Sequence, residues 1–411
     1  MILLEYIRRE LERKFLRMSA AFKAVMVTGA RQVGKSTMLR HLADREGRRY
    51  VSMDNARDRE LARSDPGLFF QTYRPPILID EIQKAPELFE PIKTFCDNSE
   101  ERSLFWLTGS ESRKMMKEAG DSLAGRVCVL KLFSLSQREL LGVFPDAPLD
   151  FSLPSLRERS RLFPKANIVT VFSHIWRGGM PEILRLDAEQ TAEYWNSYIE
   201  TYLMRDAVDD NGIADTVGFR KFLRAASAFC GRLVNYSELA SASGVSGVTA
   251  KDWMKVLQTM GIVFLLEPYA GNELKRLVKT PKLYFCDTGL AAYLSSWTSR
   301  DTLMNGAVSG HFFENYAVGE FLRTFSYGEK KATMAFYRDK EKREIDLVVE
   351  QDGALHPIEI KKSSSPDRNA IKAFGALKNA ERPVGPGGVV CMAEEPYPID
   401  AANSLIPANL I

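Results

Sequence analysis

Along the first 140 residues, short apolar runs alternate with segments of helical periodicity. Before them, a helix with one apolar face is predicted over residues 1–20. Strands that alternate with helices form a parallel sheet, because each crossover returns the chain to the same edge. We therefore predict an α/β domain with a parallel sheet over residues 1–142. The predicted strands lie at 25–27, 49–54, 75–81, 103–110 and 126–132.

The break after the first strand carries the most specific motif of the chain. It fits GxxxxGK[ST] at every fixed position, and glycines there let backbone amides turn inward around a polyphosphate. Lys35 would bring a positive charge to the β- and γ-phosphates, and Ser36 a hydroxyl to Mg²⁺. The helix that follows directs its positive end at the same phosphates. The predicted site for a nucleoside triphosphate comprises Gly29, Ala30, Arg31, Gln32, Val33, Gly34, Lys35, Ser36 and Thr37.

The third predicted strand ends abruptly in two acids, Asp80 and Glu81. At the carboxyl edge of the sheet, Asp80 would complete the Mg²⁺ shell and Glu81 would polarise the attacking water. The alternative is a strand that simply ends at a hydrophilic turn. Ser110 ends the neighbouring strand and is a candidate for positioning that water or sensing the γ-phosphate; as an alternative it is a turn residue that caps the strand.

Several motifs together resemble the uncharacterised prokaryotic ATPases of the AAA superfamily, in which a long conserved region of unknown function follows the ATPase core. The resemblance implies ATP hydrolysis with Mg²⁺ and a helical lid after the sheet domain. It also implies that Arg126 is an arginine finger that reaches a neighbour's γ-phosphate, with a structural salt bridge as the alternative. The matching segments are 28–37, 77–83, 107–110, 122–126, 177–182, 202–206 and 282–290.

The pattern changes after the sheet domain. Prolines among charges at 143–168 predict a linker, and helices at 169–215 correspond to the lid. Residues 216–295 predict helix, turn, helix and hairpin, which is the arrangement of a winged helix. In a DNA reader, the exposed face of its second helix would present Lys251 and Lys255. Docking between domains or a protein contact is the alternative for this module.

The last segment, 296–411, predicts an α+β domain with a second group of acids. A period of two places Glu359 and Lys361 on one face of a strand, and a hairpin brings Asp346 beside that face. Two carboxylates and a lysine can hold Mg²⁺ and a phosphodiester. The set resembles the PD-(D/E)xK nuclease fold, which implies that Asp346 and Glu359 bind metal, Lys361 activates water and Glu314 is the helical acid. A polar outer face on an ordinary hairpin is the alternative.

Composition limits the compartment and the number of domains. At 411 residues the chain is long enough for two to four domains, and a net charge of +3 favours no class of partner. The five cysteines are scattered without a CxxC pair, which favours a reducing compartment. No signal peptide and no bilayer-spanning run is evident, so we expect a cytoplasmic protein without a membrane partner.

Three functions fit these patterns. The first is an ATPase motor or switch that acts on DNA through the winged-helix and nuclease-like segments. The second is an ATP-dependent switch that binds protein partners, with an inactive nuclease-like scaffold. The third, a kinase-like phosphotransferase, is weakest because Asp80 and Glu81 suit water activation. An arginine finger acting between chains also implies a homo-oligomer.

Overall fold

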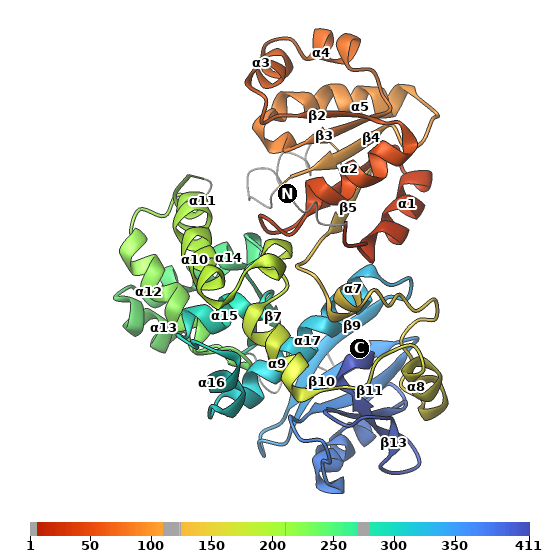
Figure 1. Cartoon of the computed structure of the whole chain (residues 1–411), viewed down its shortest axis with the longest axis vertical. Helices are drawn as coiled ribbons and strands as arrows, with labels where there is room; N and C mark the ends of the chain where they lie inside the picture. The colour runs from red at the N-terminus through yellow and green to blue at the C-terminus, as the bar shows by residue number, and fades with distance from the viewer. Residues whose placement is uncertain (1–5, 110–122, 124, 210, 270–279) are drawn as a thin grey trace.

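Three sheets follow one another from the N-terminal to the C-terminal part of the chain. A computed structural model describes residues 6–109, 123, 125–209, 211–269 and 280–411, and these sheets lie within them. Figure 1 shows the N-terminal sheet at the top, a helical region at the left and the C-terminal sheet at the bottom.

The N-terminal sheet is parallel throughout, which confirms the predicted α/β domain. Val25 and Val27 pack with one set of helices, whereas Ala24 and Met26 pack with the other, so both faces of the sheet are covered. The strands, in the order β2-β3-β4-β1-β5, are β1 (Ala24–Thr28), β2 (Arg49–Ser52), β3 (Ile77–Asp80), β4 (Phe105–Thr108) and β5 (Val127–Lys131). The helices are α1 (Leu11–Ala21) and α2 (Lys35–Glu46) on one face and α3 (Ala56–Ser64), α4 (Pro66–Thr72) and α5 (Phe89–Asn98) on the other.

The first helix is shorter than predicted. It begins at Leu11, and residues 6–9 are not helical. Within the helix that the structure describes, Leu11 and Phe15 of the predicted apolar face are buried against the sheet. Leu3 and Leu4 of that face lie outside the described residues.

The segment expected to be a linker, 143–168, contains a helix. Leu156 of this helix is buried, and Arg159 Nε donates a hydrogen bond to Leu410 O at 2.5 Å. Prolines and charges suggested an open loop, but this segment packs on the C-terminal residues of the chain. Between residues 137 and 209, the described helices are α7 (Gln137–Leu141), α8 (Leu153–Ser160), α9 (Ile168–Arg177), α10 (Ala188–Tyr198), a π-helical turn (Ile199–Leu203) and α11 (Met204–Asp209).

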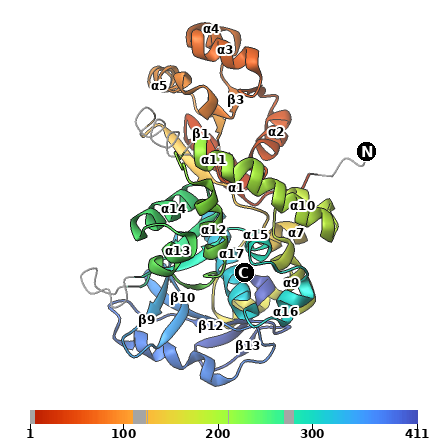
Figure 2. The same cartoon turned by 90° about the vertical axis from the view of Figure 1, so that its left-hand side faces the viewer.

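In the described part of residues 216–295, the chain folds into four helices and a small antiparallel sheet. The strand order is β6-β8-β7, so the first short strand pairs with the last. The elements are α12 (Thr216–Ser227), β6 (Arg232–Leu233), α13 (Tyr236–Ser243), α14 (Gly247–Thr259), β7 (Val263–Leu266), β8 (Lys282–Phe285) and α15 (Thr288–Leu294). Together with α10 and α11, these helices lie below the N-terminal domain in Figure 2.

The C-terminal domain combines one long helix with a mixed sheet in the order β13-β14-β12-β11-β10-β9. Strands β9, β10 and β11 pair antiparallel, and β11, β12 and β14 pair parallel. Most side chains of the helix are buried. The elements are α16 (Arg300–Asn305), α17 (Ser309–Tyr327), β9 (Ala332–Arg338), β10 (Glu344–Gln351), β11 (Ala354–Ile360), β12 (Gly387–Cys391), β13 (Tyr397–Pro398) and β14 (Asn403–Pro407).

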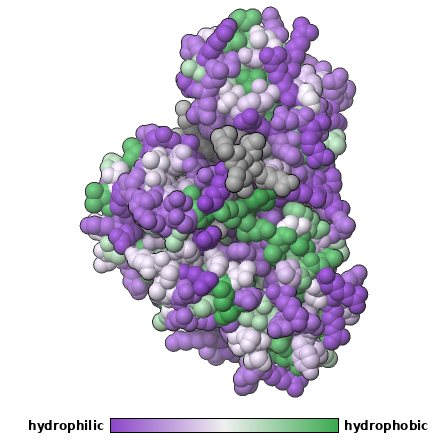
Figure 3. Space-filling view, in the orientation of Figure 1, coloured by the Kyte–Doolittle hydropathy of each residue, from purple (hydrophilic) through white to green (hydrophobic). Residues whose placement is uncertain are grey.

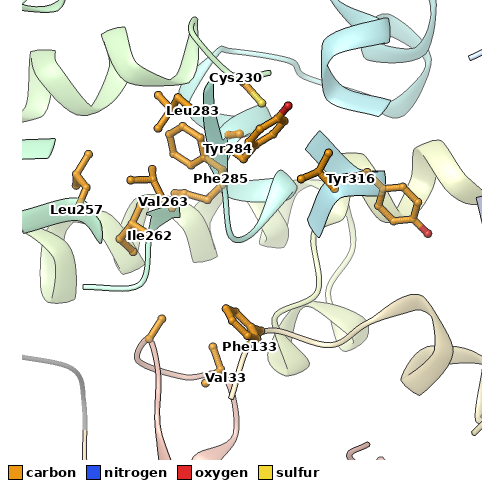
Figure 4. Packing of buried hydrophobic residues seen from close by; sticks show 14 of the residues in the cluster. Val33, Phe133, Cys230, Leu257, Ile262, Val263, Leu283, Tyr284, Phe285 and Tyr316 are labelled. Carbon is orange, nitrogen blue, oxygen red and sulfur yellow. The ribbon is translucent and has the colours of Figure 1, made fainter. Parts of the chain in front are cut away.

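One apolar cluster joins the three parts of the chain. It runs from Val33 and Phe133 in the N-terminal domain to Ile262 and Phe285 around the small sheet (Figure 4). On the face drawn in Figure 3, apolar residues gather where the N-terminal domain meets the rest of the chain. Among the described residues, no helix has the length and apolarity needed to cross a bilayer.

Two glycine-containing motifs that are far apart in sequence dock on each other at this junction. A Cβ added to Gly179 would lie 2.3 Å from Leu135 O, and one added to Gly289 would lie 2.1 Å from Arg177 O. The Asp287 carboxylate accepts a hydrogen bond from Gly179 N at 2.9 Å. A Cβ is therefore excluded at Gly289, where segment 282–290 packs on segment 177–182, and at Gly179, where the latter packs on Leu135.

A single added methyl group tests this junction. Gly179→Ala should lower the free energy of unfolding by about 1–3 kcal/mol or more, because the obstructing atom is a backbone oxygen. Gly247→Ala is the matched control, since no atom lies within 4 Å of its added Cβ. Urea unfolding followed by circular dichroism measures both, and equal stability of the two variants would contradict the close packing.

Candidate functional site

The loop after β1 has the geometry that its glycines predict. Gly29 has a φ of 139°, and an added Cβ would lie 2.1 Å from Leu132 O. Gly34 has a φ of 96° and caps α2, which begins at Lys35. At position 29, any side chain larger than hydrogen would collide with the backbone of Leu132. Glycine therefore lets the loop turn tightly, and the backbone amides of the loop lie at the N-terminus of α2.

The Lys35 ammonium lies inside this loop. Its side chain is buried, and Nζ donates to Gly29 O at 2.9 Å and to Ala30 O at 2.8 Å. The Lys35 ammonium places one positive charge beside the helix amides, where a polyphosphate would bind. By rotation of the Lys35 side chain, this compact group can turn from the loop carbonyls to the phosphates.

Asp80 lies beside the loop and accepts hydrogen bonds from two neighbouring hydroxyls at one oxygen. Ser36 Oγ donates to Asp80 Oδ1 at 2.6 Å, and the Thr108 hydroxyl donates to the same atom. Tyr50 donates to Oδ2 at 2.9 Å. A serine hydroxyl and a carboxylate in direct contact are the oxygen ligands that Mg²⁺ prefers, so Ser36 and Asp80 fit the predicted metal site.

Glu81 follows with a left-handed backbone, at a φ of 57°. Its amide donates to Thr108 Oγ1 at 3.0 Å, and its carboxylate accepts a hydrogen bond from the Gln83 amide. Thr108 therefore fixes both acids at the carboxyl edge of the sheet. Ser110, the third predicted residue of this edge, lies outside the described residues.

Arg126 has a carboxylate partner within its own chain. Its Nε and Nη2 donate to Asp97 at 2.6 and 3.1 Å, and these hydrogen bonds raise the pKa of the guanidinium. This is the structural salt bridge named as the alternative. A role of Arg126 in a neighbouring subunit's site stays a prediction.

The variable residues of the phosphate loop contact the helices that follow the sheet domain. Arg31 Nε donates to Asp206 at 2.5 Å, and Tyr194 donates to Gln32 at 2.7 Å. Both partners lie on α10 and α11, which cross below the N-terminal domain in Figure 2. The motif pattern placed Arg31 and Gln32 in the loop, but it gave no sign of these contacts.

The structure brings together three of the side chains that were predicted for the C-terminal site, Asp346, Glu359 and Lys361. Lys361 Nζ lies 2.5 Å from Glu359 Oε1 and 3.5 Å from Asp346 Oδ2. The amide of Ile360 also donates to Asp346 at 2.9 Å, which fixes the carboxylate between β10 and β11. Metal binding by Asp346 and Glu359 and water activation by Lys361 stay predictions.

Lys282 enters this acidic cluster from β8 and was not predicted as a member. Its Nζ lies 2.8 Å from Glu314, 2.6 Å from Glu344 and 3.7 Å from Asp346. The Tyr284 hydroxyl donates to Glu314 at 2.7 Å. The sequence analysis placed Lys282 at the start of the matching segment 282–290, but nothing there indicated that its side chain reaches the acids of α17 and β10.

Burial and mutual repulsion shift the ionisation of the cluster. Burial, followed by the charge of Asp346, raises the pKa of Glu314 to about 7 and that of Glu359 to about 8. Although burial opposes its charge, the carboxylates raise the pKa of Lys282 above the ordinary value. Within the described part of the chain, no three Asp, Glu, His or Cys side chains are arranged to hold a metal ion. Lys282 instead supplies the positive charge between Glu314 and Asp346.

The loop, the acids after β3 and the strand order are those of a P-loop domain of the AAA superfamily. Residues 21–141 match the family described as AAA domain, which confirms this class for the N-terminal part. Residues 170–301 and 309–411 match two families that are each described as a domain of unknown function, DUF8612 and DUF4143.

The chain is also similar to two mycobacterial proteins. "Uncharacterized protein Rv2008c" of Mycobacterium tuberculosis and "Uncharacterized protein Mb2031c" of Mycobacterium bovis are each 25% identical over 408 residues, which is 98% of this chain and 84% of theirs. Among solved structures, a Walker-type ATPase of Pyrococcus abyssi is 15% identical with a TM-score of 0.41, covering 70% of this chain and 96% of that one. A mutant of Thermotoga maritima RuvB is 16% identical with a TM-score of 0.31, covering 63% and 91%.

Removing the Lys282 charge tests the ionisation of the cluster. Glu314 and Glu359 have folded pKa values above the ordinary 4.5, so they cost stability as pH rises through about 7 and 8. Lys282→Met removes a positive charge from the cluster and should therefore raise the pKa values of Glu314 and Glu359 in the folded protein further. The variant should then lose about 3–5 kcal/mol at about pH 8.5 and markedly less at about pH 5.5.

Urea unfolding at the two pH values measures this difference. Lys221→Met, which removes an exposed lysine from α12, is the control and should follow the wild type. A Lys282→Met protein with the same loss at both pH values would show that only packing was disturbed.

Proposed function

We propose that this protein hydrolyses ATP with Mg²⁺ to drive a conformational switch, and that the switch acts on DNA through the C-terminal half of the chain. The observation that carries the ATPase part is the 2.6 Å hydrogen bond from Ser36 to Asp80 beside the buried Lys35. It places hydroxyl, carboxylate and ammonium at the N-terminus of one helix, where a triphosphate binds in this class.

Each residue then has a distinct role. Lys35 neutralises the transferred phosphate, and Ser36 and Asp80 hold the metal, which withdraws charge from the β- and γ-phosphates when it is bound. Glu81 accepts a proton from the attacking water, since Thr108 directs its backbone toward the same edge. In this proposal Ser110 positions the water, and Arg126 leaves Asp97 to complete the site of a second subunit.

The contacts of the loop support a switch. Arg31 and Gln32 bind Asp206 and Tyr194, so a change in loop conformation on nucleotide binding alters contacts with α10 and α11. A π-helical turn separates these two helices, and such turns are frequent at functional sites. We infer that residues 169–215 form the moving lid, between the ATPase domain at 1–142 and the modules that follow.

Two arrangements of elements support action on DNA. The order α12, β6, α13, α14, β7 and β8, with β6 paired to β8, supports a winged-helix module at 216–295. A long helix, an antiparallel hairpin and a parallel strand carry the acids of 296–411, which supports a nuclease-like domain. Both inferences concern the class of fold, and neither requires cleavage.

A second candidate function is favoured by one observation. Lys282 is buried and lies between Glu314 and Asp346, where a divalent cation would otherwise bind. In this alternative the C-terminal domain is an inactive scaffold, and the ATP-dependent switch binds protein partners.

The ATPase proposal is tested with Glu81→Gln. This variant should bind Mg·ATP nearly as well as the wild type, yet lose roughly a hundredfold or more of its turnover, because a general base is removed. Lys35→Ala should lose binding as well, whereas Glu87→Gln changes an exposed acid nearby and serves as the control. Calorimetry measures binding and phosphate release measures turnover; normal turnover in Glu81→Gln would remove Glu81 from the mechanism.

The two roles of the C-terminal domain are separated with the full chain, Mn²⁺ and supercoiled plasmid. A nuclease should bind Mn²⁺ and nick the plasmid, and Asp346→Ala, Glu359→Ala or Lys361→Ala should abolish nicking while ATP turnover stays near the wild-type rate. An inactive scaffold should show neither binding nor nicking. Lys282→Met then shows whether Lys282 keeps the ion out of the cluster. If it does, the variant should bind Mn²⁺ although the wild type does not.

A further inference from the structure

Two connected cavities lie beside α12. The smaller has a volume of about 330 Å³ and is lined by α12, β6 and the start of α17. The larger has a volume of about 600 Å³ and extends between α10, α12 and α15. Arg224 and Trp297 line both, so the cavities form one continuous depression, here termed the α12 groove.

The smaller end of the groove is positively charged. Arg224, Arg232 and His311 line it, and no carboxylate does so among the described residues. Neither Arg224 nor Arg232 forms an ion pair within the described part of the chain. Burial lowers the pKa of His311, and Arg232 and Lys282 lower it further, as expected in a positive field. Two guanidinium groups without carboxylate partners at one cavity favour an anionic ligand.

The larger end of the groove offers aromatic surface. Tyr293 and Trp297 are half-buried there, and Trp176 Nε1 donates to Trp297 O at 2.9 Å, which holds the two tryptophans together. Two arginines line it: Arg224 is shared with the smaller end, and Arg220 forms a two-point ion pair with Glu200. Glu189 is a further acid at this end. Positive charge without a neighbouring carboxylate is therefore concentrated at the smaller end, and aromatic rings lie at the larger end. This combination suits a phosphate backbone with unstacked bases.

We propose that the α12 groove binds single-stranded nucleic acid, with phosphates against Arg224 and Arg232 and bases against Trp297 and Tyr293. The choice of ligand rests on the proposed action on DNA, but binding requires neither ATP hydrolysis nor cleavage. A strand fits better than a mononucleotide because the two arginines lie on separate elements and the rings lie beyond them. A duplex would keep its bases stacked and away from the rings.

The groove also leads toward the acidic cluster. His311 precedes Glu314 by one turn of α17, so both side chains lie on one side of the helix. The charges of Asp346 and Glu344 act on His311, which places the positive end of the groove near these acids. A strand held in the groove would thus pass close to the residues proposed to form the nuclease-like site.

Binding of labelled oligonucleotides to the full chain tests the proposal, in EDTA and without nucleotide so that cleavage and hydrolysis do not contribute. Fluorescence anisotropy should show that a 20-nucleotide single strand binds more tightly than the matching duplex. Arg224→Ala combined with Arg232→Ala should weaken binding at least about tenfold. It should also reduce the slope of log affinity against log salt by about 1.4, since each lost single-strand phosphate contact contributes about 0.7.

The control is Arg157→Ala combined with Lys221→Ala, which removes two exposed charges outside the groove and should leave affinity and slope near the wild type. Equal behaviour of the two double variants would overturn the proposal, as would a wild type that binds no strand. Competition by thymidine monophosphate or inorganic phosphate as effective as by the oligonucleotide would replace a strand site with a simple anion site. If Lys251→Ala with Lys255→Ala alone abolishes binding, DNA contact lies on α14 and the groove is excluded. ATP turnover of the same samples reports separately on the ATPase.

Discussion

The buried guanidinium of Arg9 is the contact on which the arrangement of the domains depends. It donates to Val33 O of the phosphate loop at 2.6 Å, to Phe133 O after β5 at 2.7 Å and to Glu139 of α7 at 3.0 Å. The Arg9 side chain is only 3% exposed. These three acceptors therefore replace the hydrogen bonds to water that the guanidinium loses on folding. Loss of one partner from such a buried pair typically costs about 3–5 kcal/mol, because the other charge is left without compensation.

The segment after β5 carries this constraint onward to the C-terminal domain. The amide of Phe133 donates to the Tyr327 hydroxyl at 2.9 Å, and Arg323 donates to Ser134 at 3.1 Å and to Cys286 O at 2.8 Å. Tyr327 and Arg323 belong to α17, the helix that also carries Glu314. The phosphate loop and the acidic cluster are thus connected by a short series of buried, hydrogen-bonded contacts. Such a series is a physical route by which the two sites could be coupled. Coupling also requires an element along the route that has two conformations, each favoured by a different state of the sites.

The sequence could predict those features that depend on local pattern. The parallel sheet follows from alternating strands and helices, and the loop from Gly29, Gly34 and Lys35, because motif spacing and backbone geometry are set within a few residues. The contacts of Arg9, Asp206 and Lys282 could not be predicted, since each joins segments that are far apart in the chain. Arg9 belonged to a predicted helix with one apolar face, whereas the structure leaves residues 6–9 non-helical and buries the side chain.

The protonation and cation binding of the acidic cluster depend on residues 216–295, because this module provides Lys282. Four carboxylates (Glu314, Glu344, Asp346 and Glu359) face three cations among the described residues, namely Lys282, Lys361 and Arg338, which pairs with Glu344 at 2.7 Å. The cluster therefore has more acids than bases. The raised pKa values of Glu314 and Glu359 show that bound protons can supply part of the missing positive charge. A divalent cation could supply it instead, but it would compete with Lys282 for the oxygens of Glu314 and Asp346. Because Asn315 of α17 also holds β8 through both backbone groups of Phe285, at 2.7 and 2.9 Å, displacing Lys282 requires movement of the side chain or of the whole strand. The cation preference of the cluster therefore depends on how residues 216–295 dock against α17.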